Sequence, residues 1–183
     1  MAGDGYSTTT NPIKVPSYRD IGIKAMRNAD FQMARQMLQG AINQLEGQGD
    51  EETSIIEIMI NIADTYLQEG AFRQAKEWYA RALNRSERFQ GKNSILTASI
   101  LGRIAEVHIL EQDVPGFQNV FDCLQRVYLL TEETDMTALL NVLIDLSWAL
   151  CVHHRHREVQ LANKLIAEIK QLSKTESSDV LSA

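Results

Sequence analysis

The sequence contains few residues that break helices and few that form cross-links. Its 183 residues include 3 prolines, 10 glycines and 2 cysteines. Long helices are therefore plausible, because proline removes a backbone donor and clashes with the preceding helical turn. Cys123 and Cys151 stand far apart, in apolar helical patterns. We expect both to be reduced and buried, as is usual for cysteines in the cytoplasm.

Long apolar segments and a surplus of positive charge are also missing. Asn, Asp or Glu interrupts the longest apolar stretches within a few residues, which leaves no candidate membrane span. The first 17 residues are polar and lack the apolar centre of a secretory signal. The formal net charge of −6 argues against nucleic-acid binding, since phosphate recognition needs a basic face. We therefore expect a cytoplasmic protein that binds neither nucleic acid nor a membrane.

The sequence does contain helical periodicity, almost without interruption. Ser17 and Asp20 resemble a capping box, in which each side chain satisfies a backbone N–H at a helix start. Gly70 and Gly91 stand where apolar periodicity breaks, as is typical just beyond a helix end. We predict eight helices, at about 18–28, 31–46, 53–69, 72–88, 94–112, 116–130, 135–152 and 157–173.

This pattern divides the chain into three segments. Residues 1–16 are polar and are predicted to form a flexible arm. Residues 17–173 contain all eight predicted helices and form the folded array. Residues 174–183 are rich in polar side chains, so we predict a disordered tail.

The predicted helices repeat in pairs. Each first helix carries a small or polar residue after a branched one, at Ile21-Gly22, Ile62-Ala63, Ile104-Ala105 and Leu146-Ser147. In the second helices, Phe31, Phe72, Phe117 and Val159 each precede, by three residues, one of the anchors Ala34, Ala75, Val120 and Ala162. These anchors are 41, 45 and 42 residues apart. A stripe repeated at this spacing predicts that each pair buries the same face.

These residues resemble the tetratricopeptide repeat family. The second unit matches in residue type at Ile62, Ala63, Tyr66, Gly70, Phe72, Ala75, Tyr79 and Ala82. The resemblance covers about 18–170, weakens in the fourth unit, and is similar to the long-helix variants of kinesin light chain. It implies an all-α superhelix, or solenoid, of about four helix pairs. It also implies a non-catalytic scaffold or adaptor that binds a protein partner.

In this family the first helix of each pair lines a concave groove. The resemblance places groove positions at Arg19, Ile23, Ile60, Asp64, Leu67, Arg103, Glu106, Ile109 and Trp148. Most are apolar or adaptable, so we expect the groove to bind a peptide or a helix through apolar anchors. The alternative for Ile60, Ile109 and Trp148 is burial in the core. The family's carboxylate clamp would use Arg19 and Arg103, but Ile23 replaces one of its amides.

A second interpretation is a helical assembly or dimerisation subunit of a larger complex. The last predicted helix carries Leu161, Leu165 and Leu172 partly off its main apolar face. An apolar surface wider than one stripe favours contact with another chain. The protein would then form a homo- or hetero-oligomer through its C-terminal helices.

A third interpretation, from another class, is an enzyme. It would use the cluster His153, His154 and His156, or the pair Asp64 and Glu106 in the groove. The arginines among the histidines would repel a metal ion, so we expect a basic turn that complements the end of the preceding helix. The sequence has no phosphate-binding glycine loop and no nucleophile elbow. We therefore predict no catalytic residue, no metal and no cofactor.

Overall fold

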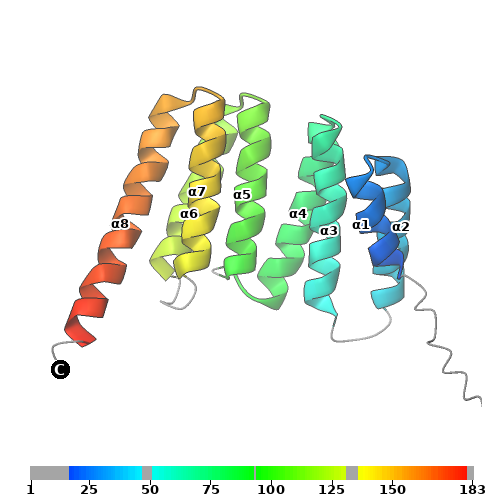
Figure 1. Ribbon diagram of the computed structural model, residues 1–183, viewed down its shortest axis with the longest axis horizontal. Coiled ribbons are helices and arrows are strands. Elements are labelled where there is room, and N and C mark those ends of the chain that lie inside the picture. Colours follow the sequence, from blue (N-terminus) through cyan, green and yellow to red (C-terminus); the bar gives the residue numbers. More distant parts are fainter. Residues whose placement is uncertain (1–16, 47–50, 93, 131–135, 181–183) are drawn as a thin grey trace, which may run out of the picture.

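The computed structural model describes residues 17–46, 51–92, 94–130 and 136–180, and within them the chain forms helices and no strand. The helices are α1 Tyr18–Arg27, α2 Phe31–Leu45, α3 Glu52–Gln68, α4 Phe72–Phe89, α5 Ile95–Leu110, α6 Val114–Leu130, α7 Met136–Val152 and α8 His156–Val180. They follow one another along the longest axis, from α1 and α2 at one end to α8 at the other (Figure 1). The predicted all-α solenoid of four helix pairs is confirmed.

Every odd-numbered helix ends in the same way. A residue in the left-handed conformation lies two positions beyond each of them: Ala29, Gly70, Gln112 and His154. After α3, the Gly70 N–H donates to the Leu67 carbonyl (3.0 Å) and the Ala71 N–H donates to the Tyr66 carbonyl (2.9 Å). The same two bonds recur after α1, α5 and α7, which makes all four ends Schellman motifs. The four left-handed residues are 41, 42 and 42 positions apart, so the repeat is regular.

This regular period confirms one predicted alignment and corrects the other. In the odd-numbered helices, one residue of each lies seven positions before the left-handed residue: Gly22, Ala63, Ala105 and Ser147. In the even-numbered helices, the position of Ala34 and Ala75 falls on Phe117 and Val159, three residues before the predicted Val120 and Ala162. The predicted 45-residue step is therefore wrong. A phenylalanine occupies a position that holds alanine in the first two units, and its size concealed the repeat.

Small residues set how closely the paired helices approach. Gly22 of α1 is buried against α2. A Cβ at Gly22 would lie 2.7 Å from Leu38 Cγ and 3.3 Å from the Ala34 carbonyl oxygen. Leu38 and Ala34 are both fully buried. The absence of a side chain at position 22 therefore permits this contact.

Among the described side chains, the core extends along the array as three clusters of buried residues. The first joins α2 to α3, the second joins α3, α4 and α5, and the third joins α5, α6, α7 and α8. A buried pair of hydroxyls, Ser86 in α4 and Thr97 in α5, adds a polar contact of 3.0 Å between the oxygens. Since α7 packs against both α5 and α8, the odd-numbered helices of the last two units touch directly.

The predicted helix start and three other expectations can be compared with the structure. Ser17 and Asp20 form the expected capping box. α8 continues to Val180, beyond the predicted end at 173, because neither glycine nor proline interrupts residues 174–180.

Cys151 was expected to be buried but is exposed. Residues 1–16 and 181–183 and the side chain of Cys123 lie outside the described part. None of the described helices is both long enough and apolar enough to cross a membrane.

Candidate functional site

One position of the odd-numbered helices forms a row across the array. Six residues before each left-handed residue stand Ile23, Asp64, Glu106 and Trp148, one each on α1, α3, α5 and α7. Because the four helix ends are equivalent, these side chains occupy the same place in each unit. All four are predicted groove residues. Three of them are half-buried, whereas Trp148 is 72% exposed. We refer to these four residues as the central row.

A hollow of about 340 Å³ lies between α5 and α7. Three predicted groove residues line it together: Arg103, Glu106 and Trp148. At Gly102 a Cβ would lie 2.7 Å from Val142 Cγ1, so the two helices approach each other closely here. The structure therefore brings the predicted residues of the third and fourth units to one place.

Two further residues of the hollow were missed by the sequence analysis. Val142 and Asp145, both on α7, also line it, together with Ser99, Gly102, Leu146 and Ala149. Asp145 occupies the position in α7 that Arg103 occupies in α5, nine residues before the left-handed residue. The repeat alignment, carried through into the fourth unit, would have identified Asp145. Val142 is visible only once the packing of α7 on α5 is known.

A polar network adjoins the hollow. The buried Tyr79 hydroxyl donates to Asp64 Oδ1. Burial raises the pKa of the Asp64 carboxyl, although the bond from Tyr79 and the charge of Arg103 lower it in part. Burial and the charge of Asp64 raise the pKa of Tyr79 far above its usual value. Tyr79 is thus a neutral donor at any physiological pH.

Arg103 connects this network to Glu106, the next member of the central row. Its Nη1 lies 3.5 Å from Glu106 Oε2. Burial lowers the pKa of Arg103, and the neighbouring Asp64, Tyr79 and Glu106 together raise it by more. The two carboxylates proposed as an acid–base pair therefore both interact with one guanidinium. This arrangement suits the fixing of charge in the groove better than the transfer of a proton.

The other predicted groove residues differ in their surroundings. Arg19 pairs with Glu57 at 2.5 Å, so both clamp arginines already have carboxylate partners. Ile60 and Leu67 are half-buried and pack against the core of α3, α4 and α5. Ile109 is 1% exposed and belongs to the core shared by α5 to α8. Its assignment to the groove is wrong, because this core, which includes leucines of α7, encloses that side of α5.

An exposed apolar stripe lies on α7. Ile144, Trp148 and Val152 are four residues apart and therefore share one face of the helix. Their exposed fractions are 41%, 72% and 55%. The alternative that placed Trp148 in the core is thus contradicted. We refer to these three residues as the α7 stripe; its central member, Trp148, also lines the hollow.

The histidine cluster lies at the turn between α7 and α8, and His156 is the first residue of α8. His153, His154 and His156 are exposed, and the rings of the last two have centroids 6.2 Å apart. His154 adopts the left-handed conformation that ends α7. Arg155 pairs with Glu158 at 2.7 Å. The cluster therefore occupies the position predicted for a basic turn, at the negative end of the α7 dipole.

The wide apolar surface predicted on the last helix is reduced in the structure. Leu161 is 42% exposed, whereas Leu165 is 4% exposed and packs in the core. The side chain of Leu172 lies outside the described part. Among the described side chains of the C-terminal pair, the larger exposed apolar surface lies on α7.

Comparison with known proteins finds a family match in one part of the chain. Residues 54–114 match the model of the Tetratricopeptide repeat family, which confirms the predicted resemblance. The crystal structure of BtubC (BKLC) from P. vanneervenii is similar in fold, with a TM-score of 0.66 and 19% sequence identity. The similarity covers 86% of this chain and 63% of that one, so this chain spans less than two thirds of its length.

A second solved structure is less similar. It is a DHF46 filament, with a TM-score of 0.43 and 15% identity, over 85% of this chain and 94% of that chain. This TM-score is too low to support an argument about the present protein. No curated protein sequence matches the chain significantly.

Proposed function

Starting from an array that matches the tetratricopeptide repeat family at residues 54–114, we propose that the protein is a non-catalytic scaffold or adaptor of the cytoplasm. It binds a peptide or a helix of a partner protein on the face formed by α1, α3, α5 and α7. Repeats of this family generally mediate protein–protein interaction. The observation that carries the proposal is the α7 stripe, because its three large apolar side chains stand exposed beside a hollow.

The chemistry of the site favours a ligand with apolar anchors. The residues Ile144, Trp148 and Val152 offer a continuous apolar surface one helical face wide, which an amphipathic helix would match with residues at similar spacing. Trp148 is the expected hot spot, since a large aromatic that becomes desolvated often carries much of the binding energy. The remaining members of the α7 stripe would exclude water around it.

The charges around the hollow add a preference for partner sequence. Glu106 and Asp145 line the hollow together with one cation, Arg103. Arg103 already interacts with Asp64 and Glu106. The surplus of carboxylates favours a ligand whose apolar anchors are flanked by lysine or arginine. Such flanking charges would mainly accelerate association, and their effect would fall with added salt.

Peptide display offers a direct test of this proposal. Peptides would be selected on the wild-type chain alone, and their affinity for the Trp148→Ala variant would then be measured. We expect enriched peptides that bind the wild type and the matched control Phe89→Ala. Phe89 is a similar aromatic, 52% exposed, at the end of α4. Selected peptides that bind wild type and Trp148→Ala equally well would contradict the groove assignment.

The rival proposal, a subunit that assembles with copies of itself, is favoured by the same stripe. A second copy could cover Ile144, Trp148 and Val152 in a two-fold arrangement. Light scattering across a range of concentrations distinguishes the two. A dimer that Ile144→Ser converts to a monomer would support self-assembly through α7, and a monomer at all concentrations would exclude it.

A further inference from the structure

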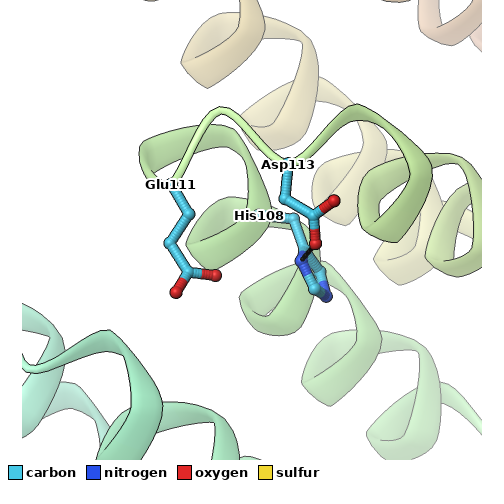
Figure 2. A group of neighbouring side chains, drawn as sticks. All are labelled: His108, Glu111 and Asp113. Atoms are coloured by element: carbon cyan, nitrogen blue, oxygen red, sulfur yellow. Dashed lines mark ion pairs between the residues drawn. The ribbon is translucent and has the colours of Figure 1, made fainter.

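The turn between α5 and α6 brings together three side chains that bind metals. His108, Glu111 and Asp113 each offer one ligand atom, and these atoms all lie within 4.8 Å of one another. His108 Nδ1 is 2.9 Å from Asp113 Oδ2. Figure 2 shows these two side chains together and Glu111 reaching down from the adjoining part of the same turn. The three residues form the only such group within the described segments.

The fold does not require these residue types at this turn. The equivalent residues are Ala25, Asn28 and Asp30 after α1, Tyr66, Glu69 and Ala71 after α3, and Leu150, His153 and Arg155 after α7. All four turns have the same backbone hydrogen bonds. Of the four, the turn after α5 alone has ligand side chains at all three positions. The backbone conformation therefore does not explain His108.

His108 is buried beside the Asp113 carboxylate, without a hydrogen bond of regular geometry. Its side chain is 14% exposed, and its Nδ1 lies 2.9 Å from Asp113 Oδ2 in an arrangement that does not form a regular hydrogen bond. A buried polar atom without a well-formed hydrogen bond costs free energy, because it has lost its hydrogen bonds to water. A cation between the imidazole nitrogen and the carboxylate oxygen would remove this cost.

The turn holds two of the ligand atoms in fixed positions. Asp113 Oδ1 accepts the Gly116 N–H at 3.1 Å, so Oδ2 remains for another partner. A Cβ at Gly116 would lie 2.4 Å from His108 Nδ1 and 2.2 Å from Asp113 Oδ2. Glycine at position 116 therefore leaves the room that these two atoms occupy.

Glu111 has a partner in the structure that would compete with a metal. Lys76 Nζ lies 2.6 Å from Glu111 Oε2. The preceding turn contains the same pair, Arg35 and Glu69, at 2.6 Å. Both pairs link consecutive units. Because Glu111 and Asp113 carry two negative charges and Lys76 one positive charge, the site has a residual negative charge that favours a cation.

From these observations we propose that His108, Glu111 and Asp113 bind a divalent transition-metal ion of the zinc class. One imidazole nitrogen with two carboxylates suits zinc, cobalt or nickel, whereas calcium and magnesium prefer ligands that are all oxygen. The glutamate would leave Lys76 and turn toward the ion. Three protein ligands leave one position for water. The ion would stabilise the junction between α5 and α6, because it binds the folded chain and not the unfolded one.

The test uses the full chain without an affinity tag, with Zn²⁺ and Co²⁺ as probes. The sequence has 4 histidines, and three of them form the exposed turn before α8, where they could bind zinc independently. The background for the test therefore carries His153→Asn, His154→Asn and His156→Asn; asparagine tolerates the left-handed conformation at 154. Calorimetry on this background should show one Zn²⁺ bound per chain, and Co²⁺ should show the visible absorption of a site with nitrogen and oxygen ligands.

Substitutions in this background separate a built site from surface binding. His108→Leu uses the residue of the equivalent position 150, and Asp113→Asn retains a helix cap. Each should weaken Zn²⁺ binding by about tenfold or more. Lys76→Gln should tighten it, because the competing ammonium is gone. Glu69→Gln removes the equivalent ion pair of the preceding unit and should leave the affinity unchanged.

Absence of Zn²⁺ binding in the background would overturn the proposal. So would equal affinity for the background protein and its His108→Leu variant, with circular dichroism confirming that both remain helical. Weaker binding in Lys76→Gln would also contradict the proposed geometry, since Lys76 would then support the ion instead of competing with it.

Discussion

The close approach of α1 and α2 predicts opposite effects for two glycine substitutions. Gly22 lies inside α1 and faces Leu38 and Ala34 of α2. Gly40 lies inside α2, where a Cβ would be 3.6 Å from the ring of Tyr18. The first contact is too short for a carbon atom, and the second is ordinary van der Waals contact. Gly22→Ala and Gly40→Ala are therefore a matched pair.

The expected magnitudes follow from two opposing terms. Alanine is favoured over glycine inside a helix by about 1 kcal/mol, and this gain applies to both variants. Only Gly22→Ala must displace Leu38, which is fully buried and cannot move aside freely. Overpacking of this kind costs about 1–3 kcal/mol. We therefore expect the free energy of unfolding to be about 1–3 kcal/mol lower for Gly22→Ala than for Gly40→Ala.

Urea denaturation followed by circular dichroism measures this difference. Both variants should unfold with the same dependence on urea as the wild type, so that the midpoints report stability. Gly40→Ala should be at least as stable as the wild type. If Gly22→Ala were stabilised as much as Gly40→Ala, the close packing of the first helix pair would be refuted.

Two further substitutions test the polar contacts of the core. Thr97→Val removes the partner of the buried Ser86 hydroxyl and should lower the unfolding free energy by about 1–3 kcal/mol. Adding Ser86→Ala should recover part of this loss, as measured by urea denaturation. Strictly additive losses would argue against the pair. The pKa of Asp64 is raised, so the folded chain holds the Asp64 proton more tightly than the unfolded chain does. The protonated carboxyl therefore contributes stability below the ordinary pKa of 3.8. This contribution is lost as the pH rises through the raised pKa. The stability of Asp64→Asn relative to the wild type should therefore increase as the pH rises from acidic to neutral. Thermal melting at each pH measures this difference, and a difference independent of pH would contradict the assignment.

The repeat could be predicted from the sequence where small residues mark it. Gly22, Ala63 and Ala105 fixed the alignment of the odd-numbered helices, because a close helix contact tolerates few side chains. In the even-numbered helices, Phe117 stands at a position where the first two units have alanine, so small residues did not mark the repeat there. The ring of Phe117 packs in the core of the last two units. The space for it is set by side chains of several helices, so the residue type at this position no longer follows the motif. The sequence alone does not reveal such compensation.

The groove could be predicted only in part. Periodicity shows which face of a helix is apolar, but not what covers that face. Ile109 and Trp148 both occupy groove positions of the family pattern, yet the first is buried and the second is exposed. The difference arises because α7 packs directly on α5, a contact between units of low motif similarity. Asp145 was within reach of the repeat alignment, whereas Val142 required the three-dimensional packing.

The central claim, that the α7 stripe binds a partner, is tested most directly by two measurements on the same Trp148→Ala protein. Because Trp148 is 72% exposed, its removal should change the unfolding free energy by about 0.5 kcal/mol or less. The melting temperature should then shift by less than about 2 °C. Affinity for a peptide selected on the wild type should fall by about 2 kcal/mol or more, roughly thirtyfold. A lowered melting temperature with unchanged affinity would contradict the account.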